Sequence, residues 1–110
     1  IAEIELTALE FTELRTLSQI SSGGAPGPES SILKIKGTEL QQDISELFIE
    51  MLAYYSHPFF NETELGSNEA IGPDYAGPAM PRYLNYRKTS IYGGSNEIQK
   101  NVIAKAILGL

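Results

Sequence analysis

YGGSNEIQKNVIAKAILGL, residues 92–110, carries the signals that begin and end one α helix. Two glycines turn the chain, and either Ser95 or Asn96 is well placed to cap the helix that follows. Apolar residues then recur at three- and four-residue steps, which predicts a helix over about residues 96–108. Gly109 stands where a glycine commonly follows a helix. The predicted apolar face consists of Ile98, Val102, Ile103, Ala106 and Ile107.

The start of this helix has two interpretations. In the first it is an ordinary loop-to-helix junction, in which Glu97 favours the positive end of the helix. In the second it is a binding site, because free N–H groups at a helix start attract anions. Gly93 and Gly94 have no side chains and would let a ligand approach the backbone closely. Adjacent glycines before a helix are common, so spacing alone leaves both interpretations open.

Two longer helices are predicted upstream. Residues 1–20 have helical periodicity, and the Gly- and Pro-rich residues 21–28 form a connection. A second helix begins near residue 29 and must end by Pro58, since the residue before proline disfavours α geometry. Gly37 lies inside it, where glycine most often permits close packing of a neighbouring helix. The predicted stripes are Ile1, Ile4, Ala8, Phe11, Leu14 and Leu17 in the first helix, and Leu33, Leu40, Ile44, Leu47, Met51 and Tyr55 in the second.

Residues 56–80 contain six Gly or Pro and predict an irregular loop, long enough to suggest a functional or partner-contacting segment. A short helix over residues 79–88 and an extended segment over 89–92 follow. No strand-length alternating segment competes, so the predicted class is all-α, an antiparallel helical bundle. The lone His57 lacks partners spaced for a metal or for catalysis, which favours a structural or surface role.

The bulk composition narrows the function. The 110 residues suffice for one domain, and a formal charge of -6 argues against a nucleic-acid partner. Without cysteine the chain has no disulfide, no zinc–thiolate site and no thiol nucleophile, which suits a reducing compartment. No membrane span or signal peptide is recognisable, and we expect a cytoplasmic protein. The chain starts in mid-pattern at Ile1 without an initiator Met, so we expect a piece of a longer chain.

Several stretches carry a family resemblance. YLNYRKTSIYGGSNEIQKNVIAK, residues 83–105, resembles the C-terminal signature of acyl-CoA dehydrogenases. The closing ILGL, residues 107–110, is similar to the end of many bacterial members. The helix from Glu3 to Arg15 and the PGPESSILK stretch, residues 26–34, also resemble theirs. The resemblance covers most of the chain and is weakest across residues 56–80.

The resemblance implies a fold and a chemistry. Members have an N-terminal helical domain, a middle β domain and a C-terminal four-helix bundle, of which this chain would be the later part. They use FAD to oxidise acyl-CoA thioesters to 2-enoyl-CoA, and pass the electrons to an electron-transfer flavoprotein. A carboxylate removes the α-proton, the β-hydrogen leaves as hydride, and hydrogen bonds to the thioester carbonyl stabilise the enolate charge. A homo- or hetero-oligomer of dehydrogenase subunits is expected.

Site residues carry over by position. Ser95, Asn96 and Glu97 match residues that contact FAD near its phosphates and ribose. Gly94 matches a position that touches the acyl thioester, and Tyr92 would line the same pocket.

Two departures from the family pattern matter. Many members carry the catalytic glutamate directly after this tyrosine, where this chain has Gly93. We therefore expect the base to lie in the missing portion or in a partner subunit, and the space at Gly93 to suit a bulky acyl group. The loop over residues 56–80 replaces a glycine-rich loop that reaches a neighbour's FAD, which would suit a heteromeric enzyme. An acyl-CoA oxidase, or a non-catalytic helical subunit, are the alternatives.

Overall fold

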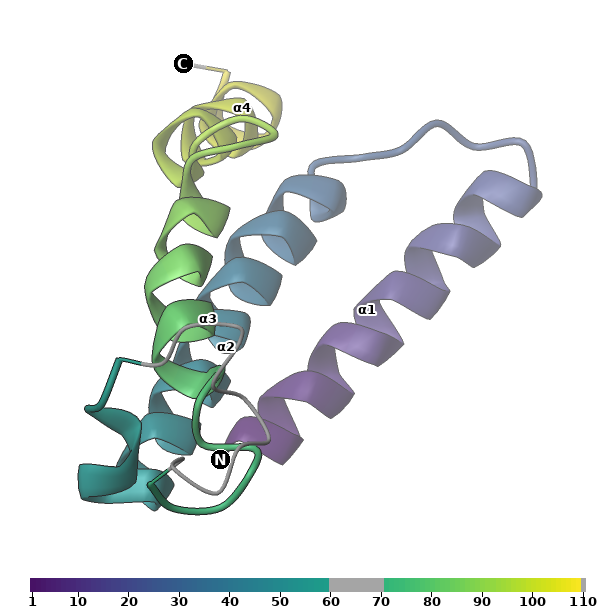
Figure 1. Cartoon of the computed structure of the whole chain (residues 1–110). Coiled ribbons are helices and arrows are strands. Elements are labelled where there is room, and N and C mark those ends of the chain that lie inside the picture. Colours follow the sequence, from purple (N-terminus) through teal and green to yellow (C-terminus); the bar gives the residue numbers. More distant parts are fainter. Residues whose placement is uncertain (60–70, 110) are drawn as a thin grey trace. The chain divides into compact units, whose positions relative to one another are not determined.

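A computed structural model of the chain describes residues 1–59 and 71–109 (Figure 1). All regular structure within those residues is helical, which confirms the predicted all-α class. Short 3-10 helices, labelled η, follow two of the α helices. The elements in chain order are α1 (Ala2–Ser21), α2 (Glu29–Leu52), η1 (Ala53–Ser56), α3 (Ala79–Tyr86), η2 (Arg87–Ser90) and α4 (Asn96–Leu108).

The chain divides into two compact units. One, the terminal unit, comprises Ile1–Gln41 and Lys88–Leu110, and the other, the middle unit, comprises Gln42–Arg87. The terminal unit therefore holds α1, the first half of α2 and α4, whereas the second half of α2 and α3 belong to the middle unit. The predicted start of α4 lies wholly in the terminal unit.

In the terminal unit, α1 has the predicted length but not the predicted buried face. Ile4 is 73% exposed and Phe11 is 64% exposed, and the side chain that α1 buries is Thr16. The Thr16 hydroxyl donates to the carbonyl oxygen of Thr12 at 2.9 Å, which satisfies its polar group inside the helix. The predicted stripe is thus uncovered, and Leu6, which lines an open cleft toward α2, is itself 55% exposed.

The N-terminal half of α2, which belongs to the terminal unit, buries Ile35 and Leu40. Of these two residues, only Leu40 belongs to the predicted stripe. Gly37 is not a close-packing position within the described residues. A Cβ built on Gly37 would meet no heavy atom within 4 Å, so no neighbouring helix presses against it. The expectation of a close helix contact at this glycine is wrong, because α1 leaves open space there.

The middle unit has a small core at the junction of α2 and the segment before α3. Leu52, Ala76 and Ala79 are buried together, and Phe48 packs against them. The Phe48 ring lies 6.2 Å from the ring of Tyr75, centroid to centroid. The described parts of the predicted loop, residues 57–59 and 71–78, are irregular as expected, whereas residues 60–70 lie outside the described residues.

One predicted element is wrong. Residues 89–92 were expected to be extended, but η2 and a turn occupy them. The Ile91 amide donates to the carbonyl of Lys88 at 2.9 Å, and the Tyr92 amide donates to the same oxygen at 3.3 Å. Helical-type bonds therefore carry the chain directly from η2 to the glycines, since β-branched residues here do not meet a partner strand.

Candidate functional site

The candidate site is the turn that leads into α4. Gly93 has φ of +69° and Gly94 has φ of +85°, both in the region that L side chains rarely adopt. The side-chain amide of Gln99 donates to the carbonyl oxygen of Gly93 at 3.2 Å and closes the turn. A Cβ on Gly94 would lie 2.7 Å from the Nε2 atom of Gln99, whereas a Cβ on Gly93 would meet nothing within 4 Å.

Ser95 is the N-cap of α4, which decides between the two predicted caps. Its backbone is extended, and its hydroxyl oxygen accepts a hydrogen bond from the Ile98 amide at 3.4 Å. At the other end, Gly109 has φ of +69° and its amide donates to the Lys105 carbonyl, as the sequence predicts. The boundaries of α4 therefore follow from local chemistry.

Glu97 projects from the first turn of α4 and is exposed. A hydrogen bond from its own backbone amide, and then one from the Ser95 hydroxyl, lower the pKa of its carboxyl from 4.5. The ammonium groups of Lys100 and Lys34 also lower this pKa, but more weakly. Glu97 thus presents an ionised carboxylate to solvent beside the glycine turn.

Asn96 behaves differently from its two neighbours. It is only 8% exposed, and its side chain points onto α2 within the terminal unit. There the Lys34 ammonium donates to the Asn96 Oδ1 atom at 2.7 Å, and the Asn96 Nδ2 atom donates to the Thr38 hydroxyl at 3.3 Å. The Asn96 side chain is therefore bonded to another helix, whereas the Ser95 hydroxyl bonds within α4.

Tyr92 is the first residue of the candidate site along the chain. Tyr92 is 57% exposed and directly precedes the turn. The five predicted site residues, together with Gly93, are thus consecutive in the chain from Tyr92 to Glu97, and the side chains of Tyr92 and Glu97 are open to solvent. Sequence reasoning missed Lys34, Thr38 and Gln99. Lys34 and Thr38 are four residues apart on α2, and this spacing of two polar groups on one face was the available signal.

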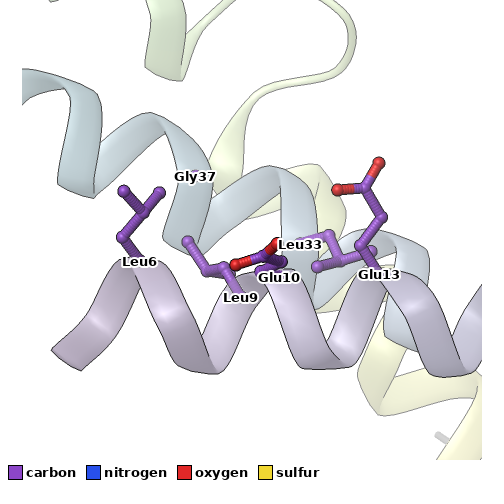
Figure 2. A pocket seen from close by; sticks show the side chains of 6 residues that line it. All are labelled: Leu6, Leu9, Glu10, Glu13, Leu33 and Gly37. Carbon is purple, nitrogen blue, oxygen red and sulfur yellow. The ribbon is translucent and has the colours of Figure 1, made fainter. Parts of the chain in front are cut away.

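A second hollow lies between α1 and α2 in the terminal unit. It is an open cleft of about 540 Å³. Figure 2 shows Leu6 and Leu9 rising from α1 toward the turn of α2 that holds Gly37. Its other lining side chains include Leu33 from α2 and two acids from α1, Glu10 and Glu13. Its polar lining consists of two carboxyl side chains, which when ionised only accept hydrogen bonds, so its side chains offer no donor to orient a small ligand.

Neither a metal-binding cluster nor a membrane span is present in the described part of the chain. Among residues 1–59 and 71–109, no three His, Cys, Asp or Glu side chains are grouped closely enough to hold a metal ion. His57 is exposed, and its ring lies 5.9 Å from that of Tyr54. No helix in the described part of the chain is both long enough and apolar enough to cross a membrane.

The geometry defines an all-α domain in which two glycines turn the chain into a capped helix. A sequence model of the family "Acyl-CoA dehydrogenase, C-terminal domain" matches residues 2–108. Since this match spans nearly the whole chain, the chain belongs to the acyl-CoA dehydrogenase C-terminal domain family. The family resemblance of the sequence is thereby confirmed.

Curated relatives match over a shorter length. The chain is 64% identical over 28 residues to the acyl-CoA dehydrogenase IpdE1 of Mycobacterium tuberculosis, and equally to that of Mycolicibacterium smegmatis. The matched segment covers 26% of this chain and 7% of each relative. No solved structure gives a significant match.

Proposed function

We propose that this chain is part of the C-terminal domain of an FAD-dependent acyl-CoA dehydrogenase that oxidises acyl-CoA thioesters to 2-enoyl-CoA. Family membership across residues 2–108 supports the enzyme class. The observation that carries the site is the start of α4, where two glycines with positive φ precede an exposed acid. FAD would supply the acceptor for the β-hydrogen, and this chain would supply part of the wall that binds it.

The residues of the turn fit one part of FAD better than another. The Glu97 carboxylate is ionised and accepts hydrogen bonds, so it suits the hydroxyl groups of a ribose and disfavours a phosphate. The Ser95 hydroxyl already accepts from the Ile98 amide and donates to Glu97. We therefore assign Glu97 to the hydroxyl-bearing part of FAD, with Ser95 orienting its carboxylate.

Phosphate oxygens would have to meet backbone instead of side chains. A Cβ on Gly93 would meet nothing within 4 Å, so the turn leaves room for such an approach at Gly93. Asn96 would contribute through its backbone and its position, because its side chain is bonded to α2. This assignment keeps all three residues in the cofactor wall and gives each a different role.

For the substrate, we assign Tyr92 and Gly94 to the acyl pocket. Gly93 offers no proton-accepting side chain, and the space around its Cα is open. The base that removes the α-proton would then come from outside this chain, in another part of the enzyme or in a partner subunit. An electron-transfer flavoprotein would receive the electrons, and subunits of the dehydrogenase would assemble as an oligomer.

The test uses the full-length enzyme that carries this chain. Its flavin absorbance should be stoichiometric and should be bleached by an acyl-CoA under anaerobic conditions. Peroxide formation in air would assign an oxidase instead, and a colourless protein would assign a non-catalytic subunit. The 110-residue chain alone should bind no FAD tightly, and a yellow, fully loaded chain would contradict the division of the site.

A variant pair tests the assignment of Glu97. Glu97→Gln should weaken FAD binding by about tenfold, the effect of losing roughly one charge-assisted hydrogen bond. The control Glu50→Gln removes an exposed acid from α2 in the middle unit and should leave the FAD dissociation constant unchanged. Equal affinities for the Glu97→Gln and unsubstituted enzymes would refute the contact.

A further inference from the structure

The side chain of Asn96 ties α4 to a helix that lies about sixty residues earlier in the chain. Lys34 belongs to α2 and lies 62 positions before Asn96, yet its Nζ atom is 2.7 Å from the Asn96 Oδ1 atom. Both side chains are part-buried, so solvent competes weakly for this bond. The bond therefore fixes where the first turn of α4 sits on α2.

The Lys34 ammonium fixes the orientation of the Asn96 amide, because the Thr38 hydroxyl lies within hydrogen-bond distance of both the Oδ1 and the Nδ2 atom of Asn96. Thr38 lies one turn after Lys34, and its hydroxyl donates to the Ile35 carbonyl at 2.9 Å. Its oxygen is then free to accept, and the Asn96 Nδ2 atom lies 3.3 Å away. If the amide were flipped, its NH2 group would face the Lys34 ammonium, which has only donors. The amide oxygen therefore faces Lys34 and the amide nitrogen faces Thr38.

We propose that Lys34 is a positioning residue for the cofactor wall, acting through Asn96 to hold the first turn of α4 and the glycine turn before it. This proposal rests on the proposed function, because the cofactor wall that Lys34 would position is part of that function. It separates the two sides of the junction: Asn96 faces α2, and Glu97 faces outward. The ammonium also brings a positive charge close to the helix start, where a cofactor carrying phosphates would lie.

The experiment is a double-mutant cycle in the full-length enzyme, read out by the dissociation constant for FAD. Lys34→Met removes the ammonium, and Asn96→Leu replaces the amide by an apolar group of similar size. Each should weaken FAD binding by about tenfold. Because Lys34 acts through Asn96, the double variant should bind FAD with about the same affinity as the single variant of lower affinity. Lys34→Arg keeps a donor and should restore most of the affinity.

Two results would overturn the proposal. Multiplying effects in the double variant would mean that Lys34 acts on FAD independently of Asn96. Unchanged affinity in Lys34→Met would mean that the bond does not position the wall. The control is Lys36→Met, which removes the same charge from the same helix at a side chain that is 61% exposed and paired with Glu39. It should leave FAD affinity unchanged.

Amide hydrogen exchange separates this proposal from the proposed function. In Lys34→Met, exchange should become several-fold faster at Ile98 and Gln99, the first-turn amides that bond to Ser95, and should stay unchanged in α1. This readout needs no cofactor. If the unsubstituted enzyme binds no FAD, the proposed function fails and the exchange result still decides whether Lys34 positions α4. Unchanged exchange in the first turn would refute the positioning role.

Discussion

The two glycines before α4 should respond differently to the same substitution, although they are adjacent in the chain. Gly93→Ala places a methyl group in open space, so its main cost is a backbone with φ of +69°. For a residue other than glycine this costs about 1–2 kcal/mol. Gly94→Ala has the same kind of strain at φ of +85° and a further collision, because its Cβ lies 2.7 Å from the Gln99 Nε2 atom.

The collision can be relieved only by moving Gln99. That movement costs the 3.2 Å hydrogen bond from Gln99 to the Gly93 carbonyl, worth roughly 1 kcal/mol. We therefore expect Gly94→Ala to destabilise the chain by about 2–3 kcal/mol, some 1 kcal/mol more than Gly93→Ala. With a urea m-value of about 1.5 kcal/mol/M, the two midpoints should differ by roughly 0.7 M.

The assay is urea unfolding of the chain, followed by far-UV circular dichroism, with Gln99→Ala as a second background. Without the Gln99 side chain there is neither a collision nor a hydrogen bond to lose, so the two alanine substitutions should become equally costly. A difference that persists in the Gln99→Ala background would refute the reasoning. So would a Gly94→Ala variant that is no less stable than Gly93→Ala.

Other substitutions follow from the same contacts. Gly37→Ala should stabilise the chain by about 1 kcal/mol in urea unfolding, because alanine favours the helix and its methyl group meets open space; a loss of stability would show that the space is filled. Ser95→Ala should cost about 1 kcal/mol through loss of the bond to Ile98, with Ser95→Asp retaining most of it. The pKa of Glu97 is lowered, so its stabilising contribution is present above pH 4.5 and is lost as the pH falls through the lower folded-state pKa. Glu97→Gln should remove that pH dependence. An NMR titration in which the pKa of the Glu97 carboxyl is not lowered would contradict this prediction. In the full-length enzyme, Gly93→Glu should reduce kcat/KM for bulky acyl-CoAs more than for slim ones, and equal changes would count against a pocket at this position.

Helix positions could be predicted from this sequence because their signals are local. Gly109 and the Gly- and Pro-rich connection after α1 end helices by backbone preference, which no distant contact overrides here. The buried faces could not be predicted, since hydrophobicity alone does not say which side of an apolar helix meets its neighbour. Thr16 is buried although it is polar, and Ile4 is exposed although it is apolar; the Thr16 hydroxyl tolerates burial because it bonds within its own helix.

The candidate site divides along the same line. The residues of the turn are consecutive, so a local pattern and the family signature were enough to single them out. The contact between Lys34 and Asn96 joins two helices, so the four-residue spacing of Lys34 and Thr38 could indicate a polar face on α2 but not its partner on α4. Gln99 was missed for a different reason. Its amide folds back onto the turn before its own helix, an interaction that competes with the solvent exposure expected for a polar helix residue.

The three side chains after the glycines make different contacts, so substitutions at the three positions should have different effects. Ser95 bonds within α4, Asn96 bonds to α2, and Glu97 faces solvent. A substitution at Glu97 alters a surface and leaves the turn in place, whereas one at Asn96 strands the Lys34 ammonium in a part-buried setting without its acceptor. Asn96→Asp is the informative intermediate, because it keeps an acceptor for Lys34 but gives up the donor to Thr38. The proposed ligand contact and the structural support thus fall on adjacent residues, and each can be tested without removing the other.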